Sequence, residues 1–240
     1  ILSMKRTDIA LAGLSGLLLA SIFPILNLWL LAWVSLVPLL AAAQDKNPAA
    51  AFKLGWLSGT VFHAGLVYWV TVSMTTYGKL PLAVSIPILL VFAAFLGLFT
   101  GLPVWAATLV RQRLGWSAFA SLPFFWVAQE HLKSWLLTGF PWDVLGYSQY
   151  RILPLVQIAD CTGVYGVSFL ILCANCALYA TIRHFLKKRR FPAAELGLTA
   201  ALLAGAWIYG ELALRELSSG PQGDRMVVAL VQPNIAQDLK

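Results

Sequence analysis

Residues 137–150 read Leu-Thr-Gly-Phe-Pro-Trp-Asp-Val-Leu-Gly-Tyr-Ser-Gln-Tyr and separate two long apolar runs. Gly139, Pro141 and Gly146 disfavour a continuous helix through this stretch. It is also rich in aromatic rings, so it is not an ordinary polar loop. Two interpretations are open. The stretch is either a belt of aromatic side chains at the level of the lipid headgroups, or a loop that contacts a lipid substrate.

The composition indicates an integral membrane protein. Of 240 residues, 60% are hydrophobic and 11% are charged, and the mean hydropathy is +0.78. Soluble domains contain about 25% charged residues, and several runs here approach the ~20 apolar residues that cross a bilayer. The net charge of +7 does not indicate a nucleic-acid partner, because most basic residues lie in short loops between apolar runs.

Seven apolar segments predict an all-α polytopic membrane domain with about seven transmembrane helices. The segments are residues 9–23, 28–43, 54–76, 82–110, about 116–137, about 163–182 and 193–214. Pro38, Pro87 and Pro103 fall inside them, where neighbouring helices tolerate kinks. Gly55 and Gly59 in the third segment predict the close approach of another helix.

The distribution of basic residues predicts that the N-terminus lies in the cytoplasm. If the segments alternate in direction, eleven of the 17 Lys and Arg residues lie on the cytoplasmic side and six lie outside. The eleven are Lys5, Arg6, Lys46, Lys53, Arg111, Arg113, Arg183, Lys187, Lys188, Arg189 and Arg190. This orientation places residues 137–150, and everything after about residue 217, on the outer face.

Ionisable residues inside the predicted helices have two interpretations each. His63 lies in the third segment, where an intramembrane His marks a functional site by default. The sequence shows no partner for it, so a hydrogen-bonded packing role is favoured. Glu130 and Lys133 are three residues apart and can pair on one helix face. We expect an ion pair at the membrane edge, and a pair that lines a polar cavity is the alternative.

The cysteines do not indicate a catalytic or metal site. Cys173 and Cys176 form a C-x-x-C pattern inside an apolar run, where thiols are inert. We therefore expect core packing rather than redox or metal chemistry, and the sequence predicts no cofactor.

The composition changes at about residue 217. Residues 218–225 read as a turn-rich linker, and the apolar, β-branched run Met226–Val231 predicts a buried strand. A lone strand cannot bury both faces, so we expect it to open a second domain. The predicted organisation is a membrane domain over 1–217, a linker over 218–225 and a second domain that begins at 226–240. Met4 resembles a natural start, and the sequence closes at Lys240 in the middle of a motif. We therefore expect it to be part of a longer protein.

Several motifs together resemble the membrane domain of bacterial apolipoprotein N-acyltransferases. They are Leu137-Thr138-Gly139-Phe140-Pro141-Trp142, Gly146-Tyr147-Ser148-Gln149, Tyr68-Trp69-Val70 with Tyr77-Gly78, and Gly163-Val164-Tyr165-Gly166-Val167-Ser168-Phe169. Val231-Gln232-Pro233-Asn234-Ile235, followed by Gln237-Asp238-Leu239-Lys240, resembles the first strand and loop of that family's nitrilase-like domain.

The resemblance implies an enzyme of lipoprotein maturation in the bacterial inner membrane. The family takes an acyl chain from a phospholipid, mainly phosphatidylethanolamine, and passes it to the amino group of diacylglyceryl-cysteine on an apolipoprotein. The acyl chain travels as a thioester on a catalytic Cys, with a Glu as base and a Lys near the oxyanion. These residues lie in an α/β nitrilase-like (carbon–nitrogen hydrolase) domain, which would follow Lys240. Since Cys161, Cys173 and Cys176 do not match the nucleophile, we expect no catalytic residue here and no activity from this chain alone.

The outer loop is the best-placed candidate to line the entry for lipid substrates. Its candidate binding residues are Phe140, Pro141, Trp142, Tyr147, Ser148 and Gln149. Two other functions stay open. A secondary transporter or channel subunit is compatible with seven helices broken by prolines. A membrane-tethered amidase is the other, because a nitrilase-like fold does not fix the reaction.

Overall fold

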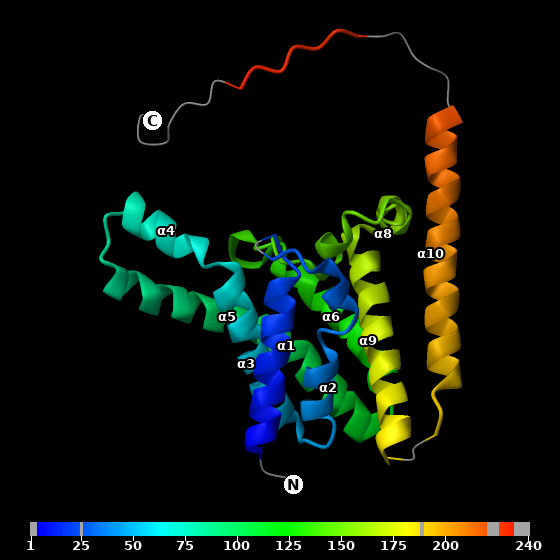
Figure 1. The fold of residues 1–240 in the computed structure, drawn as a ribbon. Helices are drawn as coiled ribbons and strands as arrows, with labels where there is room; N and C mark the ends of the chain where they lie inside the picture. The colour runs from blue at the N-terminus through cyan, green and yellow to red at the C-terminus, as the bar shows by residue number, and fades with distance from the viewer. Residues whose placement is uncertain (1–3, 25, 188–189, 220–225, 233–240) are drawn as a thin grey trace.

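A computed structural model describes residues 4–24, 26–187, 190–219 and 226–232. Over these residues the chain forms α-helices and short 3-10 helices and contains no β-strand (Figure 1). In chain order the elements are α1 (Arg6–Ser21), η1 (Trp29–Trp33), α2 (Val37–Ala43), α3 (Pro48–Leu66), α4 (Trp69–Thr76), α5 (Leu82–Leu114), α6 (Ala118–Lys133), η2 (Leu136–Thr138), η3 (Leu145–Gln149), α7 (Leu153–Val156), α8 (Ala159–Thr162), α9 (Val164–Lys187) and α10 (Ala193–Ser219).

The helices form a bundle with two distinct ends (Figure 1). The N-terminus of α1, the last turns of α2 and α9 and the start of α10 lie at one end. The other end carries α4, the segment between α6 and α9, and the last turns of α10; we call it the loop end. The candidate loop of the sequence analysis is therefore at the opposite end of the bundle from the N-terminus.

Three helices in the described part of the chain are long and apolar enough to cross a membrane. They are α5, α9 and residues Ala193–Leu217 of α10, and a fourth span exists if α3 and α4 count together. The other predicted spans form shorter elements. Helices α1 and α6 have 16 residues each, and residues 28–43 are divided between η1 and α2. The prediction of an all-α membrane bundle is confirmed for the described residues, with three or four helical spans of membrane length.

Glycines bring α3 and α5 into close contact. A Cβ atom added at Gly59 would lie 2.6 Å from the Thr100 Cβ atom and 2.9 Å from the Gly97 Cα atom. At Gly55 an added Cβ would lie 3.0 Å from the Gly101 Cα atom. The close helix approach predicted from the two glycines of α3 is confirmed, and α5 contributes glycines of its own.

Residues 28–43 were predicted to form one continuous helix, and the structure instead shows a helical segment broken in the middle. The chain forms η1, turns at residues 34–36 and begins again as α2. Pro38 lies in the first turn of α2. Backbone N–H groups in the first turn have no acceptor within the helix, so proline, which lacks an N–H, costs no hydrogen bond there. Asn175 of α9 makes hydrogen bonds with backbone groups on the two sides of this break. Its Oδ1 atom accepts from the Leu36 N–H at 2.9 Å, and its Nδ2 atom donates to the Ala32 carbonyl at 2.8 Å.

The third predicted span is bent. Helices α3 and α4 meet at 51° across Val67 and Tyr68, and the Val67 side chain is completely buried at the bend. Figure 1 shows α4 and the start of α5 extending together from the side of the bundle. Helix α5 itself continues as one helix of 33 residues through Pro87 and Pro103.

The predicted strand Met226–Val231 is not a strand in this chain. Residues 226–232 have no regular secondary structure, and the Val227 side chain is 99% exposed. An isolated segment has no neighbouring strand to accept and donate its backbone hydrogen bonds, which explains the difference. Helix α10 continues to Ser219, and residues 220–225 of the predicted linker lie outside the described residues.

Candidate functional site

The loop after α6 begins with a sharp turn. Leu137 and Thr138 have positive φ angles of 51° and 75°, and Gly139 has φ 83°. A Cβ atom at Gly139 would lie 2.2 Å from the Ser134 carbonyl oxygen, so this position requires glycine. The Phe140 N–H donates to the Lys133 carbonyl at 2.8 Å. The turn thus folds the loop back onto the end of α6.

Aromatic rings attach the loop to α4 and α5. The Trp142 ring centroid lies 5.3 Å from that of Trp69 on α4 and 5.7 Å from that of Phe140. Phe140 also meets Phe92 of α5 edge-to-face, with centroids 5.7 Å apart. These spacings are those of favourable aromatic pairs. Trp142 remains 60% exposed although it belongs to this cluster.

A cavity of about 250 Å³ lies beside the aromatic cluster. Its walls come from the end of α1, the bend between α3 and α4, and the loop. The lining is predominantly apolar and aromatic: Ala20, Phe23, Pro24, Gly65, Leu66, Val67, Tyr68, Trp69, Phe140 and Trp142. Such a surface accepts hydrocarbon rather than a charged group.

Buried charges hold the loop from the inner side. The Asp143 Oδ2 atom lies 2.6 Å from the His63 Nε2 atom on α3 and 2.5 Å from the Lys133 Nζ atom on α6. All three side chains are buried. Burial alone would raise the pKa of Asp143, but the Lys133 ammonium and His63 outweigh it and hold that pKa well below its usual range. The His63 Nδ1 atom lies 2.6 Å from the Gly59 carbonyl oxygen, so both ring nitrogens are occupied.

This cluster joins three segments that the sequence analysis treated separately. His63 has a hydrogen-bonded role, as favoured, and its partner is Asp143. The expected ion pair between Glu130 and Lys133 is wrong, because the Lys133 ammonium lies on Asp143. Glu130 is buried and accepts from the Trp126 Nε1–H at 3.0 Å and from the Leu145 N–H at 2.8 Å. Glu130 therefore anchors the second half of the loop.

The six candidate binding residues divide into two groups. Phe140 and Trp142 line the cavity, Pro141 lies between them and is half-buried, and Tyr147 is 46% exposed. Ser148 and Gln149 are buried and turn into the bundle.

The buried pair makes hydrogen bonds within the chain. The Ser148 hydroxyl donates to the Leu145 carbonyl at 2.7 Å. Gln149 accepts from the Trp33 indole N–H at 3.1 Å and donates to the Trp29 carbonyl at 3.1 Å. The structure therefore brings Phe140 and Trp142 together at the cavity and places Ser148 and Gln149 beneath the loop.

The pairing of Asp143 with Lys133 was not predicted from the sequence. Their only sequence signal was the presence of ionisable residues at the edges of apolar runs, together with the lone His63. The cysteines behave as expected, since Cys173 and Cys176 are buried in α9.

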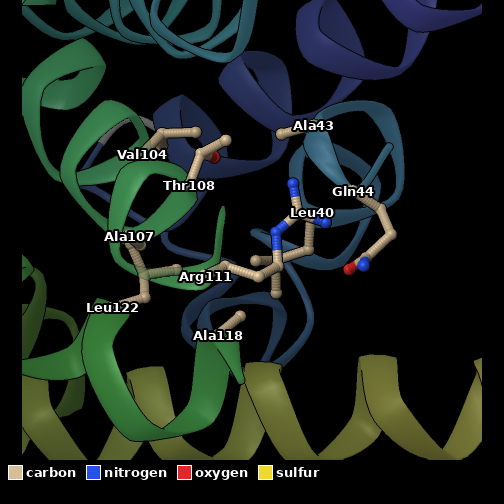
Figure 2. A pocket seen from close by; sticks show the side chains of 9 residues that line it. All are labelled: Leu40, Ala43, Gln44, Val104, Ala107, Thr108, Arg111, Ala118 and Leu122. Carbon is tan, nitrogen blue, oxygen red and sulfur yellow. The ribbon is translucent and has the colours of Figure 1, made fainter. Parts of the chain in front are cut away.

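A second cavity lies at the opposite end of the bundle, where α2, α5 and α6 meet (Figure 2). Its volume is about 30 Å³, which is close to the space of a single water molecule. Figure 2 shows the Arg111 side chain extending toward Leu40 and Gln44, and its guanidinium is 3.5 Å from the Lys46 carbonyl oxygen. This gap is too small for a lipid chain and belongs to the packing of that end.

An apolar helical bundle with spans of membrane length, and with a buried ionic cluster beneath an aromatic loop, defines a polytopic membrane domain. Residues 15–177 match the family model described as the apolipoprotein N-acyltransferase N-terminal domain. The chain belongs to this family.

Several curated relatives, each named apolipoprotein N-acyltransferase, extend the match over nearly the whole chain. One from Geobacter metallireducens is 43% identical over 99% of this chain and 45% of its own length. One from Pseudomonas putida is 34% identical over 95% of this chain and 44% of its own. One from Shewanella oneidensis is 34% identical over 99% of this chain and 44% of its own length. The chain thus spans about half the length of the curated relatives that it matches.

Proposed function

We propose that the chain is the membrane-embedded part of an enzyme that N-acylates bacterial lipoproteins. The acyl chain comes from a membrane phospholipid, and the acceptor is the amino group of an N-terminal diacylglyceryl-cysteine on an apolipoprotein. The names of the relatives support this reaction. Family membership favours it over a transporter or channel subunit.

The proposed reaction has two steps. A cysteine thiolate attacks the ester carbonyl of the phospholipid, so a C–S bond forms, a C–O bond breaks and the lysophospholipid leaves with a proton on its alcohol oxygen. The acceptor amine then attacks the thioester, so a C–N bond forms, the C–S bond breaks and the thiol is restored. The nucleophile, base and oxyanion group belong to a nitrilase-like domain that follows this chain. The part of the reaction that falls to this chain is to hold lipid chains in position.

In the proposed topology the chain crosses the bacterial inner membrane seven times, and its N-terminus lies in the cytoplasm. The membrane domain ends with α10 at Ser219, the linker extends from there to residue 225, and residues 226–240 begin the nitrilase-like domain on the outer face. The position of the last turns of α10 at the loop end supports this arrangement (Figure 1). A domain that follows α10 then sits above the aromatic loop.

The cavity beside Trp142 is the observation that carries the role of the loop. It is apolar, it lies at the loop end, and its aromatic wall is fixed by the buried cluster of His63, Lys133 and Asp143. In this proposal Phe140, Pro141, Trp142 and Tyr147 face the lipid substrate. Ser148 and Gln149 contribute by holding the loop to the bundle.

The experiment is an acyl-transfer assay with the whole protein in detergent–lipid micelles. With phosphatidylethanolamine and a diacylated lipopeptide, we expect the lipopeptide to gain one acyl chain for each lysophospholipid released. The 240-residue chain alone is expected to show no turnover. Amide hydrolysis that does not depend on lipid would favour the amidase instead. Solute flux through proteoliposomes without acyl transfer would favour the transporter, and either result would overturn the proposal.

A further inference from the structure

A larger cavity, with a volume of about 520 Å³, lies between α10 and the helices α6, α8 and α9. We call it the α9–α10 cavity. It shares no lining residue with the cavity beside Trp142. Val127 of α6, Phe169 and Leu170 of α9, and Leu202 and Ala206 of α10 provide most of its apolar wall. A surface of this kind favours hydrocarbon over water.

Small residues on α10 keep this cavity open. Gly205 lines it, and no atom lies within 4 Å of the position that a Cβ atom would take there. Helix α10 packs along α9 and α7, but much of its apolar surface stays uncovered, including Leu198, Trp207 and Ile208. Helix α10 therefore leaves open space between its Gly205 face and the bundle.

A carboxylate stands at the rim of the cavity. Tyr209 lines the cavity, and its hydroxyl donates to the Asp160 Oδ2 atom at 2.6 Å. Asp160 belongs to α8 at the loop end, and its side chain is exposed. The hydrogen bond from Tyr209 lowers the pKa of Asp160, so the carboxylate is ionised at neutral pH. The Cys161 Sγ atom lies 3.4 Å from the same hydroxyl.

We propose that the α9–α10 cavity is a lipid site that takes one acyl chain of a phospholipid whose headgroup ends in a primary ammonium, and that Asp160 pairs with the ammonium. The apolar wall and the rim carboxylate lie next to each other, as the chain and the cationic headgroup do in such a lipid. A carboxylate at this position disfavours phospholipids with purely anionic headgroups, because like charges repel near the low-dielectric membrane. This site is separate from the loop and does not depend on acyl transfer.

The test measures which lipid the purified 240-residue chain retains. The chain is equilibrated with equal amounts of phosphatidylethanolamine and phosphatidylglycerol that have identical acyl chains, and bound lipid is counted by native mass spectrometry. We expect the ethanolamine lipid to be enriched about threefold, as the free energy of an exposed ion pair allows. Asp160→Asn keeps an acceptor for Tyr209 but removes the charge, so it is expected to abolish the enrichment while lipid still binds.

Two substitutions on α10 separate the cavity from the rest of the lipid-facing surface. Gly205→Leu fills the cavity and is expected to reduce retention of both lipids. Gly197→Leu is the matched control, because Gly197 has equally open surroundings but does not line the cavity, and its retention is expected to equal that of the parent. Melting temperatures of the two variants show whether both remain folded.

Three results would overturn the proposal. The first is equal retention of the two lipids by the parent chain. The second is an enrichment of the ethanolamine lipid that survives Asp160→Asn. The third is a Gly205→Leu variant of the whole protein that loses stability without losing lipid, since this would mean that another helix occupies the cavity.

Discussion

His63 and Asp143 lie 80 positions apart in the chain, yet the His63 Nε2 atom is 2.6 Å from the Asp143 Oδ2 atom. The contact joins α3, next to its bend with α4, to the residue that follows Trp142. Lys133 approaches the same carboxylate oxygen from the end of α6. The aromatic loop is thus fixed by a contact with His63 on α3 and an ion pair with Lys133 on α6, and the position of Trp142 depends on both.

Loss of the Asp143 charge is expected to destabilise the fold strongly. Asp143→Asn leaves the Lys133 ammonium buried without its ionic partner, and breaking a buried pair in this way costs about 3–5 kcal/mol. The measurement is denaturant unfolding of the purified chain in micelles, followed by circular dichroism. Asp45→Asn is the control, because Asp45 pairs with Lys187 at 3.2 Å and the two side chains are 52% and 56% exposed. Such an exposed pair contributes about 0–1 kcal/mol. Equal losses for the two variants would contradict the buried cluster.

The same cluster predicts how stability depends on pH. The pKa of Asp143 is lowered to about 2 in the folded chain, whereas an unfolded Asp titrates near 3.9. The ionised carboxylate therefore stabilises the fold fully above about pH 4, and this stabilisation is lost as the pH falls through about 2. The stability difference between the parent and Asp143→Asn should shrink over that window. A difference that stays constant from pH 5 to about pH 2 would show that the charge of Asp143 does not stabilise the fold.

Close packing of α3 on α5 is tested at Gly59. Valine there would place its Cβ atom 2.6 Å from the Thr100 Cβ atom, and overpacking of this kind costs about 1–3 kcal/mol. Gly13→Val on α1 introduces the same side chain where no atom lies within 4 Å. Unfolding measurements should show a clearly larger loss for Gly59→Val, and a loss no larger than that of Gly13→Val would refute the close contact.

Local signals predicted the parts of the fold that depend on local chemistry. The apolar runs predicted an all-helical membrane protein, and Gly55 with Gly59 predicted the close approach of another helix, which the structure shows to be α5. The buried surroundings of Cys173 and Cys176 followed from their apolar neighbours. In each case the physical cause lies within a few residues of the feature it determines.

The remaining features depend on contacts between distant segments. The break in residues 28–43 is stabilised by Asn175, which follows more than 130 positions later in the chain. Gly65 precedes the bend at Val67, but a glycine inside an apolar run does not by itself specify a bend. Val67 is buried there in a cluster with Leu89 and Leu96 of α5. Lys133 was assigned to Glu130 by spacing, but Asp143 binds it once the loop folds back. The partner residues, such as Asn175 and Asp143, lie on other segments of the chain, so the sequence pattern of a single helix cannot reveal them.

The proposed orientation is tested with cysteine labelling in intact spheroplasts. Cys161→Ser provides a background without the exposed native thiol. In that background, a cysteine replacing the exposed Lys79 should react with a membrane-impermeant maleimide from outside. A cysteine replacing the exposed Lys187 should react only after permeabilisation. The reverse pattern would invert the topology and move the aromatic loop to the cytoplasmic face.

In the proposed function, the cavity beside Trp142 positions a lipid chain for acyl transfer. The most direct test of this role is the rate of thioester formation and of lipopeptide acylation by the whole protein in matched membranes. Trp142→Ala removes one wall of the cavity and is expected to slow thioester formation about tenfold or more, as misplacement of a reactant does. Trp142→Phe keeps an aromatic ring and should show a smaller decrease.

Trp135→Ala is the matched control, because Trp135 is also 60% exposed but does not line the cavity. We expect this variant to retain the parent rate, and all variants to reach parent levels in the membrane. If Trp142→Ala and Trp135→Ala both form the thioester and acylate the lipopeptide at the parent rate, the loop is only an interfacial aromatic belt and the claim is wrong.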